Sequence, residues 1–329
     1  LAMNRIRIPE RLANVDGKVL ALSLAAAVLL AALWGPTARL ERPVYQYLLI
    51  LDITQSMNTL DYTRDGRPVS RLAFAKDAIR QALARLPCGS RVGLGIFTEH
   101  RSMVLIAPVE VCGAYTELTT TLARLDWRMA WAGASEVAKG LYSALRLARQ
   151  IEPRPTVVFV TDGHEAPPLD PAHRAPLAAE AGAVAGLIVG TGGFAPMRIP
   201  KYDMAGDALG YWSSDDVVQS IGGGRGPASA EHLSSLRESY LQSLAQEAGL
   251  HYRRLATAAD LGEALTAREW TRPMAVSVDL RPLLGWLALA FLIAAYATGR
   301  SWPSPFPAMA ARLSSLALRV RARRRAGAA

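Results

Sequence analysis

Two short, uninterrupted apolar runs constrain the fold of this chain most strongly. Residues 47–51 are Tyr-Leu-Leu-Ile-Leu, and residues 156–160 are Thr-Val-Val-Phe-Val. A strand with one face in water alternates apolar and polar residues, whereas the strands of a parallel sheet are covered on both faces and are apolar throughout. Both runs therefore predict buried strands of a parallel sheet that carries helices on each side.

Helical and extended patterns alternate along residues 37–281, as a doubly wound α/β fold requires. Residues 71–86 carry apolar side chains at helical spacing, and a short polar turn separates residues 91–98 from 102–109, which predicts a hairpin. The other expected elements are helices at 114–125, after Ser135 and at 231–248, and strands at 183–190 and 251–255. The predicted fold is a doubly wound, Rossmann-like sheet with one antiparallel edge hairpin.

Hydroxyl and carboxylate side chains follow the ends of both apolar runs. Asp52, Thr54 and Ser56 come directly after the first run. Asp162 follows the second run, and Ser135 stands at a loop-to-helix junction. The carboxyl ends of parallel strands meet at one edge of a sheet, and hard divalent cations prefer oxygen ligands without His or Cys. Each residue alone is more often a turn or helix-cap residue, but together they favour a cation site.

These positions resemble the metal-ion-dependent adhesion site of the von Willebrand factor A-domain family. Its pattern is Asp-x-Ser-x-Ser after the first strand, a Thr in a Gly-containing loop and an Asp after the fourth strand. Asp52, Thr54 and Ser56 match the first element, with Thr in place of the first Ser. Ser135 stands for the Thr, and Asp162 for the last Asp. The resemblance implies that the hydroxyls bind a divalent cation directly and the two Asp largely through water, with Mg²⁺ expected and Mn²⁺ or Ca²⁺ as alternatives.

The whole layout resembles bacterial membrane-anchored A-domain proteins of the Bat type and those associated with MoxR ATPases, including accessory proteins of methanol dehydrogenase. The residues that carry this resemblance are 52–57, 71–76, 92–97 and an insertion at about 194–229 that contains a predicted hairpin. It implies a non-catalytic protein-binding module for the assembly or maturation of a periplasmic enzyme complex. The alternatives are a metal-dependent hydrolase that uses the same site and a structural membrane protein whose site is empty.

Two apolar segments, 19–36 and 282–298, flank the predicted domain, and we expect both to be transmembrane helices. For the first segment an uncleaved anchor is favoured over a cleaved signal peptide. The chain has a net charge of +9. Residues 1–18 carry four basic and two acidic side chains, and residues 299–329 carry seven Arg and no acid. Since the basic excess lies in these flanks, the positive-inside rule predicts a two-pass inner-membrane protein with cytoplasmic termini and residues 37–281 in the periplasm.

This charge distribution argues against nucleic acid as a partner. The expected partners are the lipid bilayer and an extracytoplasmic protein client that supplies an Asp or Glu to the metal. A MoxR-type AAA ATPase or sister A-domain proteins are further candidates, through the basic tail or the membrane helices. The sequence has no nucleophile elbow, Walker loop or His-Glu-x-x-His helix, so it gives no support to an enzyme.

Cys88 and Cys112 lie at equal distances in sequence from His100, the centre of the predicted hairpin turn. Antiparallel pairing would bring them opposite each other, so a disulfide is favoured over two buried free thiols. A disulfide also fits an oxidising compartment.

A second group of polar residues, His164, Glu165, Asp170 and His173, lies in a Pro-containing loop. Their spacing matches no metal-binding motif, so an exposed polar loop is favoured over a second metal site.

Overall fold

The computed structural model describes residues 17–168, 175–203, 205–218 and 230–297. Predictions about the first 16 residues and about the basic tail at 299–329 lie outside the described residues. The chain divides into two units, one formed by Glu41–Met274 and the other by Leu1–Leu40 with Ala275–Ala329.

A six-stranded sheet forms the centre of the larger unit, with the strand order β13-β8-β7-β2-β5-β6. The strands are β2 (Gln46–Asp52), β5 (Arg91–Thr98), β6 (Arg101–Glu110), β7 (Thr156–Thr161), β8 (Gly186–Thr191) and β13 (His251–Leu255). Neighbouring strands run parallel, except that β6 pairs antiparallel with β5 at one edge. The predicted α/β fold with a mixed sheet is therefore confirmed.

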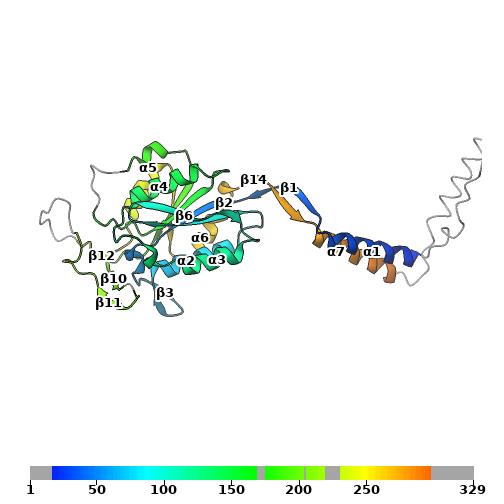
Figure 1. Ribbon diagram of the computed structural model, residues 1–329, viewed down its shortest axis with the longest axis horizontal. Helices are drawn as coiled ribbons and strands as arrows, with labels where there is room; N and C mark the ends of the chain where they lie inside the picture. The colour runs from blue at the N-terminus through cyan, green and yellow to red at the C-terminus, as the bar shows by residue number, and fades with distance from the viewer. Residues whose placement is uncertain (1–16, 169–174, 204, 219–229, 298–329) are drawn as a thin grey trace, which may run out of the picture. The chain divides into compact units, whose positions relative to one another are not determined.

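Alternate side chains of β2 enter two hydrophobic cores, one on each face of the sheet. Tyr47, Leu49 and Leu51 pack with α2, α3 and α6, whereas Leu48 and Ile50 pack with α4 and α5. These helices are α2 (Arg71–Leu83), α3 (Tyr115–Arg124), α4 (Val137–Arg149), α5 (Glu238–Ala248) and α6 (Ala258–Leu265). Figure 1 shows the two groups of helices on opposite sides of the sheet. Because both faces are covered, residues 47–51 of the strand carry the continuous apolar run that the sequence shows.

The hairpin of β5 and β6 pairs Thr98 with Arg101 at its turn and Arg91 with Glu110 at its open end. Just beyond that end Cys88 and Cys112 form a disulfide with their Cα atoms 5.3 Å apart. The disulfide favoured by the sequence is therefore confirmed. The disulfide lies at the amino end of β5, whereas the predicted cation ligands lie at and after the carboxyl ends of β2 and β7. The disulfide and the ligands therefore lie at opposite ends of the parallel strands.

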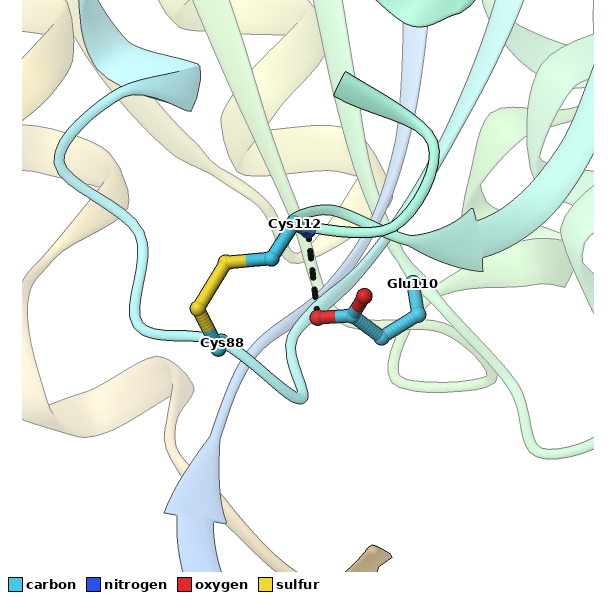
Figure 2. Close-up of side chains that lie close together, drawn as sticks. All are labelled: Cys88, Glu110 and Cys112. Atoms are coloured by element: carbon cyan, nitrogen blue, oxygen red, sulfur yellow. Dashed lines mark hydrogen bonds between the residues drawn. A yellow bond between two sulfur atoms is a disulfide. The ribbon is translucent and has the colours of Figure 1, made fainter. Parts of the chain in front are cut away.

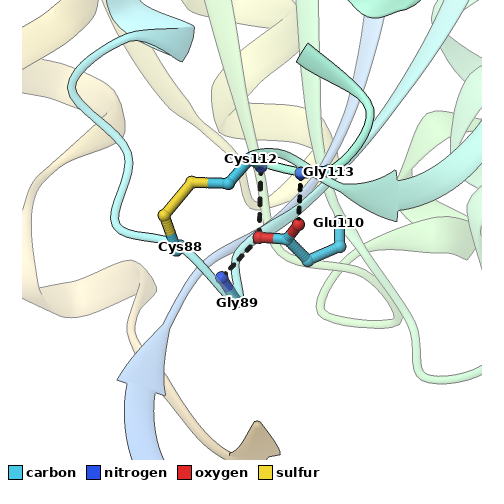
Figure 3. Close-up of a disulfide and its surroundings, with 5 residues drawn as sticks. All are labelled: Cys88, Gly89, Glu110, Cys112 and Gly113. Atoms are coloured by element: carbon cyan, nitrogen blue, oxygen red, sulfur yellow. Dashed lines mark hydrogen bonds between the residues drawn. A yellow bond between two sulfur atoms is a disulfide. The ribbon is translucent and has the colours of Figure 1, made fainter. Parts of the chain in front are cut away.

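The carboxylate of Glu110 lies beside this disulfide (Figure 2). Its Oε1 accepts hydrogen bonds from the backbone N–H of Gly89 at 2.7 Å and of Cys112 at 3.1 Å, and its Oε2 accepts one from Gly113 at 2.6 Å (Figure 3). Partial burial opposes ionisation, but these donors outweigh it and hold the pKa of Glu110 below its ordinary value. The two sulfur atoms and the carboxylate lie close together. Since the two sulfur atoms form a disulfide, they are not thiolate ligands, and the cluster is a structural crosslink and not a metal site.

The segment between β8 and α5 adds two small antiparallel sheets. They pair β9 (Met197–Arg198) with β12 (Leu233–Ser234) and β10 (Pro200–Tyr202) with β11 (Ala208–Tyr211). The second pair is the hairpin predicted for the insertion. The predicted helix at 231–248 is partly wrong, because its first residues form β12 and α5 begins only at Glu238.

A further hairpin, β3 (Tyr62–Arg64) and β4 (Arg67–Val69), was not predicted. Its turn is Asp65-Gly66, and both residues have positive φ, 51° and 74°. Asp-Gly is a preferred sequence for a two-residue turn that needs positive φ at both positions. The sequence therefore contained a usable signal for this hairpin.

The other unit contains two helices of 17 residues each, α1 (Gly17–Leu33) and α7 (Arg281–Ala297). They pack along each other through small side chains, and Ala25, Ala288 and Ala295 are buried. Strand β1 (Thr37–Val44) pairs with β14 (Arg272–Asp279), and the boundary between the two units falls within both strands. Within the part of the chain that the structure describes, no helix has the length and apolar character needed to cross a membrane. The predicted spans are therefore not shown by the structure.

Candidate metal centre

The structure brings the predicted cation ligands together from separate elements. Asp52 is the last residue of β2, and Thr54 and Ser56 lie in the turn that follows, which includes the 3₁₀ helix η2 (Gln55–Asn58). Asp162 follows β7 directly, and Ser135 lies two residues before α4. All five side chains are buried, with exposed fractions of 4% or less. Parallel strands place their carboxyl ends at one edge, and the site lies at that edge.

Ser135 is held by the two loops on either side of it. Its backbone N–H donates to Ala166 O at 2.6 Å, and the Ala166 N–H donates back to Ser135 O at 2.8 Å. On the other side Ser135 forms a parallel bridge with Glu99, which follows β5. The residue that the sequence could place only at a loop-to-helix junction therefore has a fixed backbone position between the ends of β5 and β7.

Hydrogen bonds organise the first carboxylate of the site. Oδ1 of Asp52 accepts from the backbone N–H of Thr54 at 2.8 Å and from its hydroxyl at 2.7 Å. Oδ2 accepts from the hydroxyl of Thr161 at 2.6 Å. The Thr54 and Ser56 hydroxyl oxygens are 3.4 Å apart. Asp52 therefore fixes the turn that carries both hydroxyls.

The two carboxylates of the site repel each other. Burial, together with the charge of Asp162, raises the pKa of Asp52 to about 7. Burial acts on Asp162 in the same direction, but the charges of Arg71 and His164 and the hydrogen bonds from the His164 backbone and Ser56 together outweigh it and hold the pKa of Asp162 below its ordinary value. A cation next to Asp52 would relieve the repulsion that raises its pKa, because an opposite charge favours the ionised carboxylate.

Arg71, which the sequence analysis did not assign to the site, neutralises Asp162. Its Nη1 donates to Asp162 Oδ2 at 2.6 Å and to the hydroxyl of Ser234 at 2.6 Å. Its Nη2 and Nε donate to the carboxylate of Asp61 at 2.7 and 2.9 Å. The Arg71 side chain is fully buried. The buried ion pair with Arg71 therefore holds the Asp162 carboxylate in place without a divalent cation.

Among the described residues that line the cavity beside the site, two buried side-chain atoms have no hydrogen-bond partner, Ser135 Oγ and His164 Nδ1. Both residues line the same cavity of about 330 Å³, which Thr54 and Ser56 also line. A buried hydroxyl without a partner costs free energy, so its presence is a reason to expect a ligand. The donor set of three hydroxyls and two carboxylates fits a hard divalent cation and does not fit a metal that prefers sulfur or imidazole.

Glu165 supports the position of Ser135 from a different loop. Its carboxylate oxygens accept from the backbone N–H groups of Val137 at 3.0 Å and Ala138 at 3.2 Å, in the first turn of α4, and from the Tyr240 hydroxyl at 2.5 Å. Burial raises the pKa of Glu165. The residue therefore caps α4 in place of Glu136, whose side chain makes no cap hydrogen bond.

The prediction of an exposed polar loop after β7 is wrong for its first residues. His164 is 3% exposed and Glu165 is 9% exposed, because the loop packs against α4 and α5. Asp170 and His173 lie outside the described residues.

The curated relatives share only part of their length with this chain. A UPF0353 protein of Mycolicibacterium gilvum is 27% identical over 174 residues, and one of Mycolicibacterium vanbaalenii is 28% identical over 174 residues. Each alignment covers 50% of this chain and 48% of the relative. The chain therefore spans about half the length of the curated relatives it matches.

Among solved structures, the chain is similar to an aerotolerance-related membrane protein of Bacteroides fragilis. That protein is 18% identical, with a TM-score of 0.47, and the match covers 67% of this chain and 96% of that one. The conserved hypothetical protein BatB of Bacteroides thetaiotaomicron is 17% identical, with a TM-score of 0.47 and coverage of 68% and 97%.

A family model matches the part of the chain that runs from β2 to the loop after β7 and contains all five candidate ligands. The matched residues are 47–164, and the model describes the von Willebrand factor type A domain. The chain therefore carries a von Willebrand factor type A domain over residues 47–164.

Proposed function

We propose that this chain is a non-catalytic, metal-dependent protein-binding module. A divalent cation, with Mg²⁺ as the first candidate, is held by the hydroxyls of Thr54, Ser56 and Ser135, while Asp52 and Asp162 supply negative charge around it. The cation provides a positive point charge with an exchangeable coordination position. An acidic side chain of a partner protein fills that position, so binding of the partner depends on the cation.

The unsatisfied Ser135 hydroxyl carries this proposal. It is 2% exposed and lies in the cavity that Thr54 and Ser56 line, yet it has no hydrogen-bond partner among the described residues. The turn after β2 brings the hydroxyls of Thr54 and Ser56 to the same cavity. The carboxylates of Asp52 and Asp162 accept hydrogen bonds from these two hydroxyls, so the unpaired Ser135 hydroxyl lies beside a set of hard oxygen donors.

We further propose that the module is anchored to the cytoplasmic membrane and serves the assembly or maturation of a periplasmic enzyme complex. The anchoring is supported by large apolar side chains on α1 and α7 that are exposed. Leu30 and Leu33 on α1 are 65% and 77% exposed, and Leu283 and Trp286 on α7 are 64% and 71% exposed. Large exposed apolar surfaces mark contacts with membranes or other proteins.

Titration of the full chain in detergent with Mn²⁺ tests the metal site, because the electron paramagnetic resonance signal of free Mn²⁺ is lost when the ion binds. We expect one bound Mn²⁺ that Mg²⁺ displaces and that the Ser135→Ala variant binds at least tenfold more weakly. Ser243→Ala is the matched control, since Ser243 is exposed on α5. Equal Mn²⁺ binding by the wild type and the Ser135→Ala variant would contradict the assignment of the ligands.

Partner binding needs a second measurement. Crosslinking and pulldown from native membranes should recover a protein in Mg²⁺ that is lost in EDTA and lost with Ser135→Ala, but retained with Ser243→Ala. Recovery that is independent of both the cation and Ser135 would show that binding does not use this site.

A further inference from the structure

The cavity beside the candidate metal centre has two chemically different walls. Thr54, Ser56 and Ser135 form the oxygen-rich wall. A second, mainly apolar wall comes from the insertion and from the loop after β7, with the apolar lining residues Ala166, Pro167, Ile199, Trp212, Val217 and Val218. A ligand that contacts both walls must carry an anionic group and an apolar group a short distance apart.

The apolar wall is attached directly to the turn that carries the hydroxyls. Trp212 Nε1 donates to the side-chain Oε1 of Gln55 at 2.6 Å, and Gln55 lies between Thr54 and Ser56 in sequence. The Trp212 backbone N–H donates to Ile199 O at 3.0 Å. The wall therefore has a defined position relative to the candidate ligands and is part of the same built site.

The charged groups around the apolar wall are paired with each other. Lys201 Nζ lies 4.6 Å from the centre of the Trp212 ring and 3.1 Å from Asp216 Oδ1. Glu231, which also lines the cavity, accepts from Arg237 Nη2 at 3.3 Å. Each of these charged groups has a partner within the protein. A ligand therefore gains most from this wall by covering its apolar side chains and excluding water from them.

We propose that this cavity selects a short partner segment in which a large apolar side chain lies next to the acidic residue that reaches the cation. This inference rests on the proposed function and names the chemistry of its partner. A volume of about 330 Å³ is at the lower end of the range for ligand pockets, so it suits one or two side chains of an extended segment. The cation binds the carboxylate, and the wall around Trp212 and Val218 binds the neighbouring apolar side chain.

Burial of one large apolar side chain strengthens binding by about tenfold or more. An acidic segment with a neighbouring Phe should therefore bind at least tenfold more tightly than the same segment with Ser in place of Phe. Replacing the Asp by Asn removes the carboxylate and should abolish binding of either segment.

Fluorescence anisotropy of labelled peptides with the full chain in detergent tests the proposal. The probes are fluorescein-labelled Gly-Gly-Ser-Asp-Phe-Ser-Gly-Gly, its Asp-Ser counterpart and its Asn-Phe counterpart, each in Mg²⁺ and in EDTA. We expect the order Asp-Phe, Asp-Ser, Asn-Phe in Mg²⁺ and no binding in EDTA. The Trp212→Ala variant should bind the Asp-Phe and Asp-Ser peptides equally, with the Mg²⁺ dependence unchanged.

Tyr211→Ala is the matched control, because Tyr211 precedes Trp212 in the same segment, is 52% exposed and does not line the cavity. It should keep the preference for Asp-Phe. Equal, Mg²⁺-dependent binding of Asp-Phe and Asp-Ser by the wild type would overturn this inference and leave the proposed function intact. Binding that is unaffected by EDTA, or no binding of any acidic peptide, would overturn both.

Discussion

Arg71 and Asp162 form an ion pair of 2.6 Å in which neither side chain is exposed to solvent. The same guanidinium binds Asp61, so one cation is shared by two acids. The pair gives the candidate metal centre a fixed carboxylate at the end of β7 even when the protein holds no divalent ion.

Replacing Arg71 with Met should lower the free energy of unfolding by about 3–5 kcal/mol, because removing one partner of a buried pair leaves an uncompensated charge. Mg²⁺ should restore part of this loss, since a bound cation places positive charge near Asp162. Denaturant unfolding in EDTA and in Mg²⁺ measures both effects. Arg80→Met is the control, because Arg80 is exposed and pairs with Asp77 on the surface of α2. If Arg71→Met lowers the free energy of unfolding no more than Arg80→Met does, the buried pair does not stabilise the fold.

The Asp52→Asn variant should be at least as stable as the wild type in EDTA and should lose the stabilisation that Mg²⁺ gives the wild type. The buried charge of Asp52 is opposed by burial and by Asp162, and the substitution removes that cost. Thermal unfolding in EDTA and at increasing Mg²⁺ concentrations measures both the stability of the variant and its stabilisation by Mg²⁺. Asp77→Asn, which removes a partly buried carboxylate of α2 outside the site, should leave the Mg²⁺ effect unchanged. If Mg²⁺ stabilises the Asp52→Asn variant as much as the wild type, Asp52 does not contribute to cation binding.

Removing the cap that Glu165 provides should destabilise the start of α4. Glu165→Ala leaves the backbone N–H groups of Val137 and Ala138 without their acceptor, at a cost of about 1–3 kcal/mol. Because α4 begins two residues after Ser135, Mn²⁺ affinity should fall as well. Glu136→Ala is the matched control, since it removes a carboxylate at the same helix terminus that makes no cap hydrogen bond. If both variants behave alike in unfolding and in Mn²⁺ titration, Glu165 does not position the site.

Reduction of the disulfide should affect stability and leave cation binding unchanged. The bond closes a loop with a sequence separation of 24, and the chain-entropy model gives a stabilisation of about 3 kcal/mol for a loop of this length. The Cys88→Ser, Cys112→Ser double variant should show this loss in denaturant unfolding, and its Mn²⁺ affinity should equal that of the wild type because the disulfide and the cation site lie at opposite ends of the parallel strands. A large change in Mn²⁺ affinity would contradict that separation.

The positions of Asp52 and Asp162 were predictable because each follows a strand whose apolar sequence identifies it. Alternate residues of such a strand face opposite cores, so the whole strand is apolar. The first polar residue after the apolar run therefore marks the carboxyl end of the strand. The start of α5 was not predictable in the same way. Leu233 belongs to an apolar pattern at helical spacing, but pairing of β12 with β9 takes this residue out of the helix.

The role of Arg71 depends on contacts that are remote in sequence, since Asp162 and Ser234 lie 91 and 163 residues away. One local signal was present. Arg71 is the first residue of α2, where a basic side chain is unfavourable because the helix dipole places positive charge at that end. A basic residue in that position indicates an acidic partner from elsewhere in the fold. No comparable signal identified Glu165, whose acceptor role is defined only by the packing of its loop against α4.

The hydrogen bond between Gln55 and Trp212 joins two parts of the protein that can change independently in evolution. The proposed cation site requires oxygen atoms at positions 54 and 56, whereas position 55 and the insertion are free of that requirement. Substitutions in the insertion can therefore alter which partner is accepted while the ion and its ligands stay the same. Under the proposed function, proteins with this cation site can therefore share the ion and differ in the partner that they bind.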